Sequence, residues 1–148
     1  MPYILDRLRT LVAADLMSRR VVQLEPETRL EDASQVFASQ GLTSAPVVDA
    51  QGICIGMLSA ADFIKPNRGG EIVDATSCDG TVRSLMTPGV QSVYPTTSLL
   101  HVATMMSAGH LHHLPVIENE RVVGVVSALD VVSAMVNAVD EWDAAHRA

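Results

Sequence analysis

Two short stretches of the chain carry a serine and an aspartate at the same spacing. They are Gly56–Asp62 and Gly124–Asp130, and each reads Gly-x-x-Ser-x-x-Asp. An apolar run ends at the serine, and an apolar pattern of helical period follows at once. Each stretch therefore predicts a strand, a serine and a helix, in that order. If the carboxylate faces a cleft, it can accept hydrogen bonds from a vicinal diol such as that of ribose.

The same residues also suit a purely structural role. A serine between a strand and a helix can cap the helix through its hydroxyl, and an aspartate in the first turn complements the helix dipole. Capping is the simpler interpretation of either copy alone. The unchanged spacing of both copies favours binding, because capping alone would also accept threonine, asparagine or glutamate.

Composition and charge limit the classes of function. The chain has 148 residues, of which 48% are hydrophobic, so it can form one compact domain. Its formal charge of −7, from 10 basic and 17 acidic residues, argues against nucleic acid as a partner. No apolar run approaches ~18 residues, and the first residues lack the order of a signal peptide. We therefore expect a soluble, cytoplasmic protein with no membrane partner.

Metal binding is the main alternative chemistry. The two cysteines, Cys54 and Cys78, are too few for a zinc knuckle or a disulfide framework. Histidine residues are close together in the sequence at His101, His110, His112 and His113, and imidazole groups can bind zinc or nickel. Adjacent side chains of an extended segment point to opposite faces, so we expect no metal site within the chain.

The chain contains an internal repeat. At an offset of 69 residues Leu16–Ser18 matches Leu85–Thr87, and at 68 Gly56 matches Gly124. Prolines match as well, at Pro26 and Pro95 and at Pro46 and Pro115. Each half reads β-α-β-β-α, and neither half can bury both faces of so small a sheet alone. The expected fold is α/β, in which two pseudo-symmetric repeats pack sheet to sheet around a pseudo-twofold axis.

Helical patterns extend this core at both ends. Apolar residues at helical spacing predict a short helix over residues 3–12 and a long final helix after Asp130. Within the first repeat we expect a strand at Val21–Leu24 and a helix capped by Thr28 that ends near Gly41. The expected boundaries are 11–66 for repeat 1, 67–80 for a linker, 81–139 for repeat 2 and 140–148 for a helical extension, all within one module of residues 1–148.

In their repeated order, these motifs resemble a tandem pair of cystathionine-β-synthase (CBS) domains, a Bateman module, over about residues 11–139. The resemblance implies a module that binds an adenosine-containing ligand between its repeats. Candidates are AMP, ADP, ATP, NAD(H) and S-adenosylmethionine, and no other cofactor is required. It also implies association of two modules into a homodimer. Such modules sense nucleotides, for example in energy sensing, and regulate an attached enzyme or channel; here the regulated partner is a separate, unknown protein.

The resemblance further implies two unlike sites, each built from both repeats. One combines Ser59 and Asp62 with Gln91 and the segment Leu111, His112 and His113. The other combines Ser127 and Asp130 with Val22 and the segment Leu42, Thr43 and Ser44. In both, the aspartate takes the ribose hydroxyls, the serine reaches the ribose or phosphate, and the strand backbone holds the adenine edge.

Histidine distinguishes the two sites. A protonated imidazole of His112 or His113 can pair with a phosphate oxygen near neutral pH, whereas the other site offers only the hydroxyls of Thr43 and Ser44. We therefore expect phosphorylated ligands to prefer the site of Asp62, and adenosine-like or weakly charged ligands to prefer the site of Asp130. The alternative is that one histidine packs beside Leu111 and Leu114 while the other is solvated.

Enzymatic function finds little support in the sequence. Neither serine lies in a Gly-x-Ser-x-Gly elbow, and Gly69–Gly70 lacks the lysine and hydroxyl residue that follow in a phosphate-binding loop. We expect a regulatory module without catalytic residues. The alternative is a structural or protein-interaction module with degenerate clefts, which would use its terminal helices to dock a partner.

Overall fold

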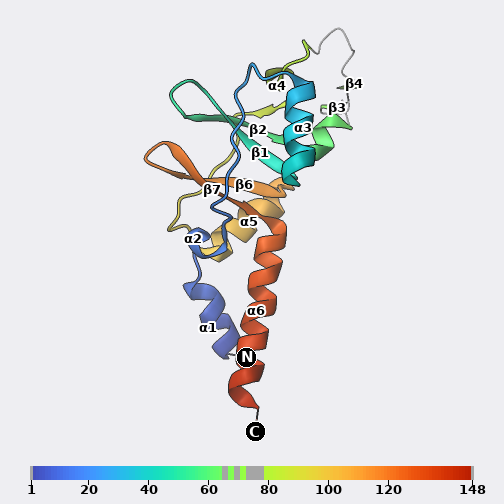
Figure 1. The fold of residues 1–148 in the computed structure, drawn as a ribbon. Coiled ribbons are helices and arrows are strands. Elements are labelled where there is room, and N and C mark those ends of the chain that lie inside the picture. Colours follow the sequence, from blue (N-terminus) through green and yellow to red (C-terminus); the bar gives the residue numbers. More distant parts are fainter. Residues whose placement is uncertain (1, 65–66, 69–70, 73–78, 148) are drawn as a thin grey trace. The chain divides into compact units, whose positions relative to one another are not determined.

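The computed structural model describes residues 2–64, 67–68, 71–72 and 79–147 (Figure 1). Cys78 and most of the expected linker lie outside them. The chain is a mixed α/β protein with two compact units. Unit 1 comprises Met1–Arg20, Gln91–Asn119 and Val123–Ala148, and unit 2 comprises Val21–Val90 and Glu120–Val122.

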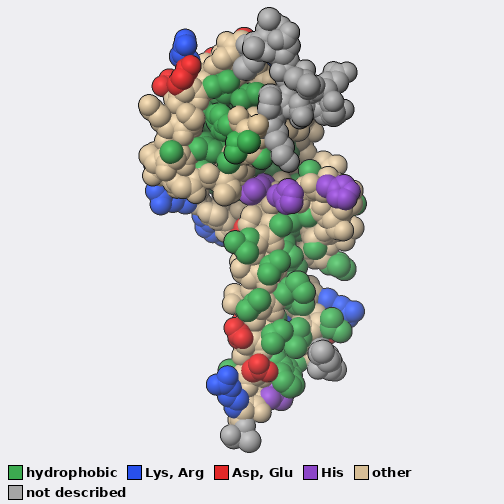
Figure 2. Space-filling view, turned by 90° about the vertical axis from the view of Figure 1, so that its right-hand side faces the viewer, with side chains coloured by type: hydrophobic (Ala, Val, Ile, Leu, Met, Phe, Trp, Pro, Cys, Tyr) green, Lys and Arg blue, Asp and Glu red, His purple; other side chains and the backbone are tan. Residues whose placement is uncertain are grey.

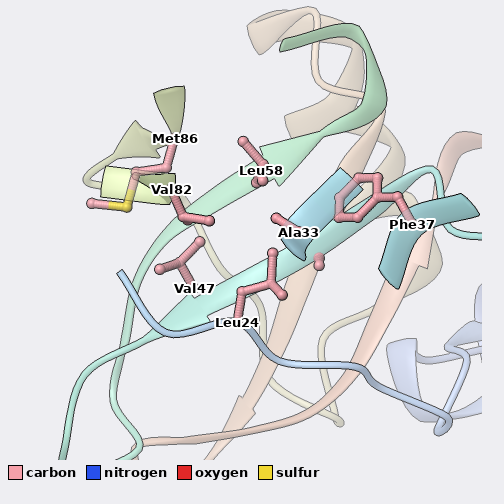
Figure 3. Packing of buried hydrophobic residues seen from close by; sticks show 8 residues of the cluster. Leu24, Ala33, Phe37, Val47, Leu58, Val82 and Met86 are labelled. Atoms are coloured by element: carbon pink, nitrogen blue, oxygen red, sulfur yellow. The ribbon is translucent and has the colours of Figure 1, made fainter. Parts of the chain in front are cut away.

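Unit 2 is a three-stranded antiparallel sheet covered by helix α3. Its elements are α3 (Leu30–Gln40), β1 (Ser44–Val48), β2 (Cys54–Ser59), the 3₁₀ turn η1 (Ala60–Phe63), α4 (Val82–Leu85) and β5 (Thr87–Pro88), with a separate pair β3 (Asn67–Arg68) and β4 (Glu71–Ile72). Leu24, Phe37, Val47 and Leu58 pack together in its core (Figure 3). The Phe37 ring meets Phe63 edge-on at 5.5 Å, so the turn after β2 is anchored to α3.

The start of α3 differs from the sequence expectation. Thr28 does not cap it: the N-cap is Arg29, without a side-chain cap bond. The Thr28 carbonyl instead accepts the Val82 amide at 2.9 Å, which attaches α4 to this segment. The other end agrees with the expectation, because Gly41 ends the helix at φ 65°, a left-handed conformation that glycine adopts without strain.

The expected strand at Val21–Leu24 is also wrong. Only Leu24 forms a bridge, parallel to Val47, with 2.9 Å bonds from its amide to the Pro46 carbonyl and from the Val48 amide to its carbonyl. Pro46 has no amide to donate, so the pairing does not extend. In unit 1 Val93 makes the equivalent parallel bridge to Val116.

Unit 1 packs three longer helices with a β-hairpin. Its elements are α1 (Pro2–Thr10), α2 (Ala13–Leu16), α5 (Leu99–Gly109), β6 (His113–Glu118), β7 (Arg121–Ser127) and α6 (Ala128–His146). The expected first and last helices are thus present as α1 and α6. Figure 1 shows α1 beside the C-terminal half of α6, where Arg7 pairs with Glu141 at 3.1 Å. In the part of the chain that the structure describes, no helix has the length and apolarity needed to cross a membrane.

The leading segment of each repeat pairs with the sheet of the other repeat. Ser18, from repeat 1, bridges Val125 in unit 1 with amide-to-carbonyl distances of 2.9 and 3.1 Å. Thr87, from repeat 2, pairs with Met57 in unit 2. Each leading segment therefore extends the sheet of the other repeat, and the compact units do not coincide with the sequence repeats.

Close packing explains the repeated glycine. A Cβ atom at Gly124 would lie 2.8 Å from Met17 Cγ and 3.0 Å from the Ser18 carbonyl oxygen. At Gly56 it would lie 2.8 Å from both Met86 Sδ and the Thr87 carbonyl oxygen. Real Cβ atoms do not approach other atoms so closely, so each glycine admits the leading segment of the opposite repeat.

Gly124→Ala should therefore lower the free energy of unfolding by about 1–3 kcal/mol through overpacking, as measured by urea denaturation. Met17→Ala in the same chain removes the methionine side-chain atoms that the new Cβ would meet. The double variant should therefore be more stable than the sum of the two single changes predicts. Strict additivity would contradict direct contact between the two side chains.

Candidate functional site

The junction between β7 and α6 holds Ser127 and Asp130 in a reciprocal pair of hydrogen bonds. The Ser127 amide donates to Asp130 Oδ2 at 2.8 Å, and the Asp130 amide donates to Ser127 Oγ at 3.1 Å. This is a capping box with aspartate in place of the usual glutamate. The serine is extended, at φ −102° and ψ 161°, so the chain turns from strand to helix at this residue.

The junction between β2 and η1 keeps half of this arrangement. The Ser59 amide donates to Asp62 Oδ2 at 2.8 Å, but the Ser59 side chain makes no cap bond. The following helix is a single 3₁₀ turn, Ala60–Phe63, rather than the longer helix that the sequence pattern indicated. Both junctions thus fix the aspartate in the same way, through one carboxylate oxygen and the serine amide.

A third aspartate repeats this geometry without a serine. The Val12 amide donates to Asp15 Oδ2 at 2.9 Å at the start of α2. Asp15 is not among the candidate residues named from the sequence, although it follows Val12 at the same separation along the chain as Asp62 follows Ser59. The three-residue spacing of Val12 and Asp15 could have identified this pair, but Val12 has no hydroxyl group and so does not match the serine–aspartate motif.

Each junction is held against the segment before the first hairpin strand of its own repeat. The Ala60 amide donates to the Thr43 carbonyl at 2.9 Å, and the Ala128 amide donates to the His112 carbonyl at 2.8 Å. Ser44 lies directly opposite Ser59 in the sheet. The structure therefore brings Ser59 and Asp62 together with Thr43 and Ser44, and Ser127 and Asp130 together with His112 and His113.

The two histidines beside Asp130 lie in different environments. His112 is exposed, whereas His113 is half-buried. Burial lowers the pKa of His113, the neighbouring His112 lowers it further, and the charge of Asp130 acts in the opposite direction. Burial and its neighbour therefore disfavour the charged form of His113.

Leu42 and Leu111 occupy equivalent places after α3 and α5. Their amides donate to Phe37 and Met106 carbonyls at 2.9 Å, and their side chains pack against the cores of units 2 and 1. His110 precedes Leu111 at φ 52°, where glycine stands in the first repeat. These leucines contribute packing, and their backbone positions the residues that follow.

Val22 and Gln91 lie in irregular segments, Val22 half-buried and Gln91 exposed. Each of the two sites expected from the sequence combines residues from unit 1 with residues from unit 2. Those combinations therefore remain predictions.

Among the described residues, no three histidine, cysteine or acidic side chains are placed to hold a metal ion. Figure 2 shows histidine side chains exposed on one face. The amide of His101 donates to Ser98 Oγ at 3.1 Å, at the start of α5. Cys54 is half-buried, and burial raises the pKa of its thiol, so it is not a reactive thiolate.

Known proteins share this sequence pattern and fold. A homoserine O-acetyltransferase of Methanococcoides burtonii is 25% identical over 119 residues, which are 80% of this chain and 23% of that protein. The chain thus spans about a quarter of the length of this curated relative.

Two solved structures show the same fold. CBSX2 of Arabidopsis thaliana, solved in complex with AMP, has a TM-score of 0.74 at 23% identity and covers 85% of this chain and 96% of its own. The CBS domain pair of protein MJ0100, solved with 5′-methylthioadenosine and S-adenosyl-L-methionine, has a TM-score of 0.75 at 21% identity and covers 86% and 98%.

The CBS domain model matches the sequence twice, at residues 12–66 and 82–137. These segments make up most of the chain, and each ends beyond one of the serine–aspartate junctions. The chain therefore belongs to the CBS domain family, as a tandem pair of CBS domains.

Proposed function

We propose that the chain is a regulatory module that binds an adenosine-containing ligand and signals to a separate partner protein. The observation that carries the proposal is the matched geometry of Asp62 and Asp130, each held by a 2.8 Å bond from a serine amide. The AMP complex of CBSX2 and the adenosyl ligands of MJ0100 support the class of ligand.

The carboxylates are suited to a ribose diol. The amide bond uses Oδ2 and fixes the orientation of the group. Within the described residues, Oδ1 of neither aspartate takes part in a hydrogen bond. A carboxylate has about four acceptor positions, so it can receive both hydroxyls of a diol while it keeps the backbone bond. Because its orientation is already fixed, binding loses little side-chain entropy.

A regulatory role is favoured over catalysis. CBS domain pairs are in general regulatory and non-catalytic, and the acetyltransferase relative matches this chain over only 23% of its length. In that protein the similar part is one region of a larger enzyme. This chain would then transmit ligand binding to its partner through a change in shape or association.

Ligand binding should raise the melting temperature of the protein, because a ligand bound only by the folded state stabilises it by RT ln(1 + [L]/Kd). A panel of AMP, ADP, ATP, NAD(H), 5′-methylthioadenosine and S-adenosylmethionine should contain at least one such ligand. Asp62→Asn or Asp130→Asn should weaken binding about tenfold, as expected for loss of a charged hydrogen-bond acceptor, in isothermal titration calorimetry.

Asparagine retains an oxygen that can accept the serine amide, so these variants should stay folded. Asp49→Asn is the matched control, because Asp49 Oδ1 also accepts backbone amides, from Gln51 at 2.9 Å and Ile53 at 3.0 Å, but in the β1–β2 turn, at the other end of these strands from Ser59. It should leave affinity unchanged. No shift with any ligand would instead favour an interaction module with degenerate clefts.

Phosphorylated ligands should depend on His112, whose side chain is exposed. His112→Ala should weaken AMP about three- to tenfold, through loss of one charge-assisted contact, and leave adenosine unchanged. The effect should be larger in the Asp130→Asn background, where the site of Asp62 remains. Equal AMP affinity of wild type and His112→Ala would contradict this role.

We also propose a homodimer built by the terminal helices. One face of α6 exposes a stripe of apolar side chains at spacings of three and four residues: Leu129 (71% exposed), Val132 (52%), Val136 (53%) and Val139 (43%). This is the spacing of a helix–helix seam, and Figure 2 shows hydrophobic side chains gathered on that part of the molecule.

Val136→Asp should therefore convert the dimer to a monomer in sedimentation velocity, because it would bury an unpaired charge in the seam. Ser34→Asp adds the same charge to an exposed position of α3 and should leave the dimer intact. A wild-type chain that sediments as a monomer at micromolar concentration would refute the dimer.

A further inference from the structure

Helices α1, α5 and α6 of unit 1 pack against one another and enclose an apolar groove of about 300 Å³. Each helix contributes apolar side chains to its walls: Leu5 and Leu8 of α1, Leu99 and Leu100 of α5, and Val131 and Met135 of α6. The volume is at the lower end of the range of small-molecule sites. The groove is distinct from both serine–aspartate junctions, whose serines and aspartates do not line it.

Several side chains in the walls of this groove are exposed. Leu100 is 69% exposed, Leu5 53% and Met135 51%. Burial of such apolar surface by a ligand is favourable, because it removes the surface from water. Large apolar side chains that gather around a hollow indicate a binding site, whereas those scattered singly over a surface do not.

Among the described residues that line the groove, Arg9 alone is charged. Within the same part of the chain its guanidinium group makes no ion pair or hydrogen bond. Arg7, two positions earlier on α1, is instead paired with Glu141 at 3.1 Å. Arg9 lies in the last turn of α1, where a cation complements the helix dipole, and this role leaves its N–H donors unused. An anionic group at the groove can therefore form a charge-assisted pair with Arg9.

The chemistry of the lining defines the ligand. None of the described lining residues is aromatic, so the walls suit a flexible aliphatic chain rather than a flat ring. One arginine balances one negative charge, and a guanidinium group pairs with a carboxylate through two parallel hydrogen bonds. The formal charge of the whole chain is −7, which disfavours an anionic membrane surface and favours a single free ligand that meets the local cation.

We propose that this groove binds a free aliphatic carboxylate of medium length, with its hydrocarbon chain between α1, α5 and α6 and its carboxylate paired with Arg9. This ligand lies outside the adenosine class, so the site is additional to the proposed function. Arg9 and both leucines of α1 precede residue 12, where the match to the CBS domain model begins. The charged end of the site and one of its walls therefore come from a helix outside the CBS repeats.

The test is a titration of the full chain followed by methyl NMR, with three ligands that share one aliphatic chain and differ in the head group: octanoate, 1-octanol and octylammonium. Octanoate should shift the Met135 methyl signal and leave that of Met86, in the core of unit 2, in place. It should bind about tenfold more tightly than 1-octanol, the value of one charge-assisted contact, and octylammonium should bind more weakly still. Decanoate should bind up to about fifteenfold more tightly than octanoate, because two further methylene groups leave water.

Two variants separate the charge from the cavity. Arg9→Gln should bring the affinity for octanoate to within about twofold of that for 1-octanol and leave 1-octanol binding unchanged. Ala103→Leu fills the groove with a larger side chain of α5 and should weaken both ligands by about tenfold or more, in a chain whose melting temperature shows that it is folded. Arg19→Gln is the matched control, because it removes the same charge from an exposed position of unit 1 outside the groove, and it should keep the preference for octanoate.

Equal wild-type affinities for octanoate and 1-octanol would overturn the proposal, as would a preference that persists in Arg9→Gln. If octanoate dissociates a dimer of the chain in sedimentation velocity, the groove belongs to a contact with a second copy and the proposal is wrong. Sedimentation of the chain with phosphatidylcholine vesicles, without a response to octanoate, would assign the groove to a lipid surface and also overturn it. None of these results decides the proposed function, because the serine–aspartate junctions do not line this groove.

Discussion

The packing of a methionine against a glycine determines how this chain is assembled. Met17 contacts the surface at Gly124, and Met86 the surface at Gly56, so each sheet receives its last extended segment from the other repeat. The serine–aspartate junction begins three residues after each glycine. The methionine that packs on the glycine therefore also holds in place the end of the strand at which the junction begins. Neither unit can complete its core without chain from the other repeat, as Ala13 and Val82 show by complete burial.

Periodicity was enough to predict most elements but not their partners. The apolar spacing after Asp130 indicated the long helix α6, and Gly41 correctly marked the end of α3. The offset between the repeats showed that two segments are alike, yet likeness does not reveal which sheet each segment joins. The exchange depends on a methionine side chain that packs where a glycine has no Cβ, and the two residues are far apart in the sequence: Met17 and Gly124 in one case, Met86 and Gly56 in the other. The capping preference of threonine was also misleading at Thr28. Its side chain does not cap α3, and its carbonyl accepts a hydrogen bond from the distant Val82 amide.

At the junctions, the structure shows that each aspartate accepts a capping bond from a serine amide, and this bond is compatible with the proposed role in binding. The serine and aspartate types, their spacing and their duplication could be read from the sequence, and the structure shows that one carboxylate oxygen serves the backbone. Such a bond orients the group without exhausting its acceptor capacity. The sequence could not distinguish the two copies in this respect, because the Ser59 hydroxyl lacks the bond that Ser127 makes. Nor did the sequence mark Asp15, because the residue three positions before it, Val12, has no hydroxyl.

Electrostatics gives the two junctions different surroundings despite their shared geometry. Asp62 lies in a single 3₁₀ turn whose last residue, Phe63, packs on Phe37, whereas Asp130 lies in the first turn of a 19-residue helix. The adenosine part of a ligand is the same in every candidate, so it can be held by the element that the repeats have in common. Discrimination must then come from the 5′ substituent, whose charge differs among the candidates. Beyond Asp130, α6 continues to Glu141, which pairs with Arg7 of α1 at 3.1 Å, and both of these residues lie outside the segments that match the CBS domain model. Repetition thus accounts for what the two sites share, and the terminal helices for how they can differ.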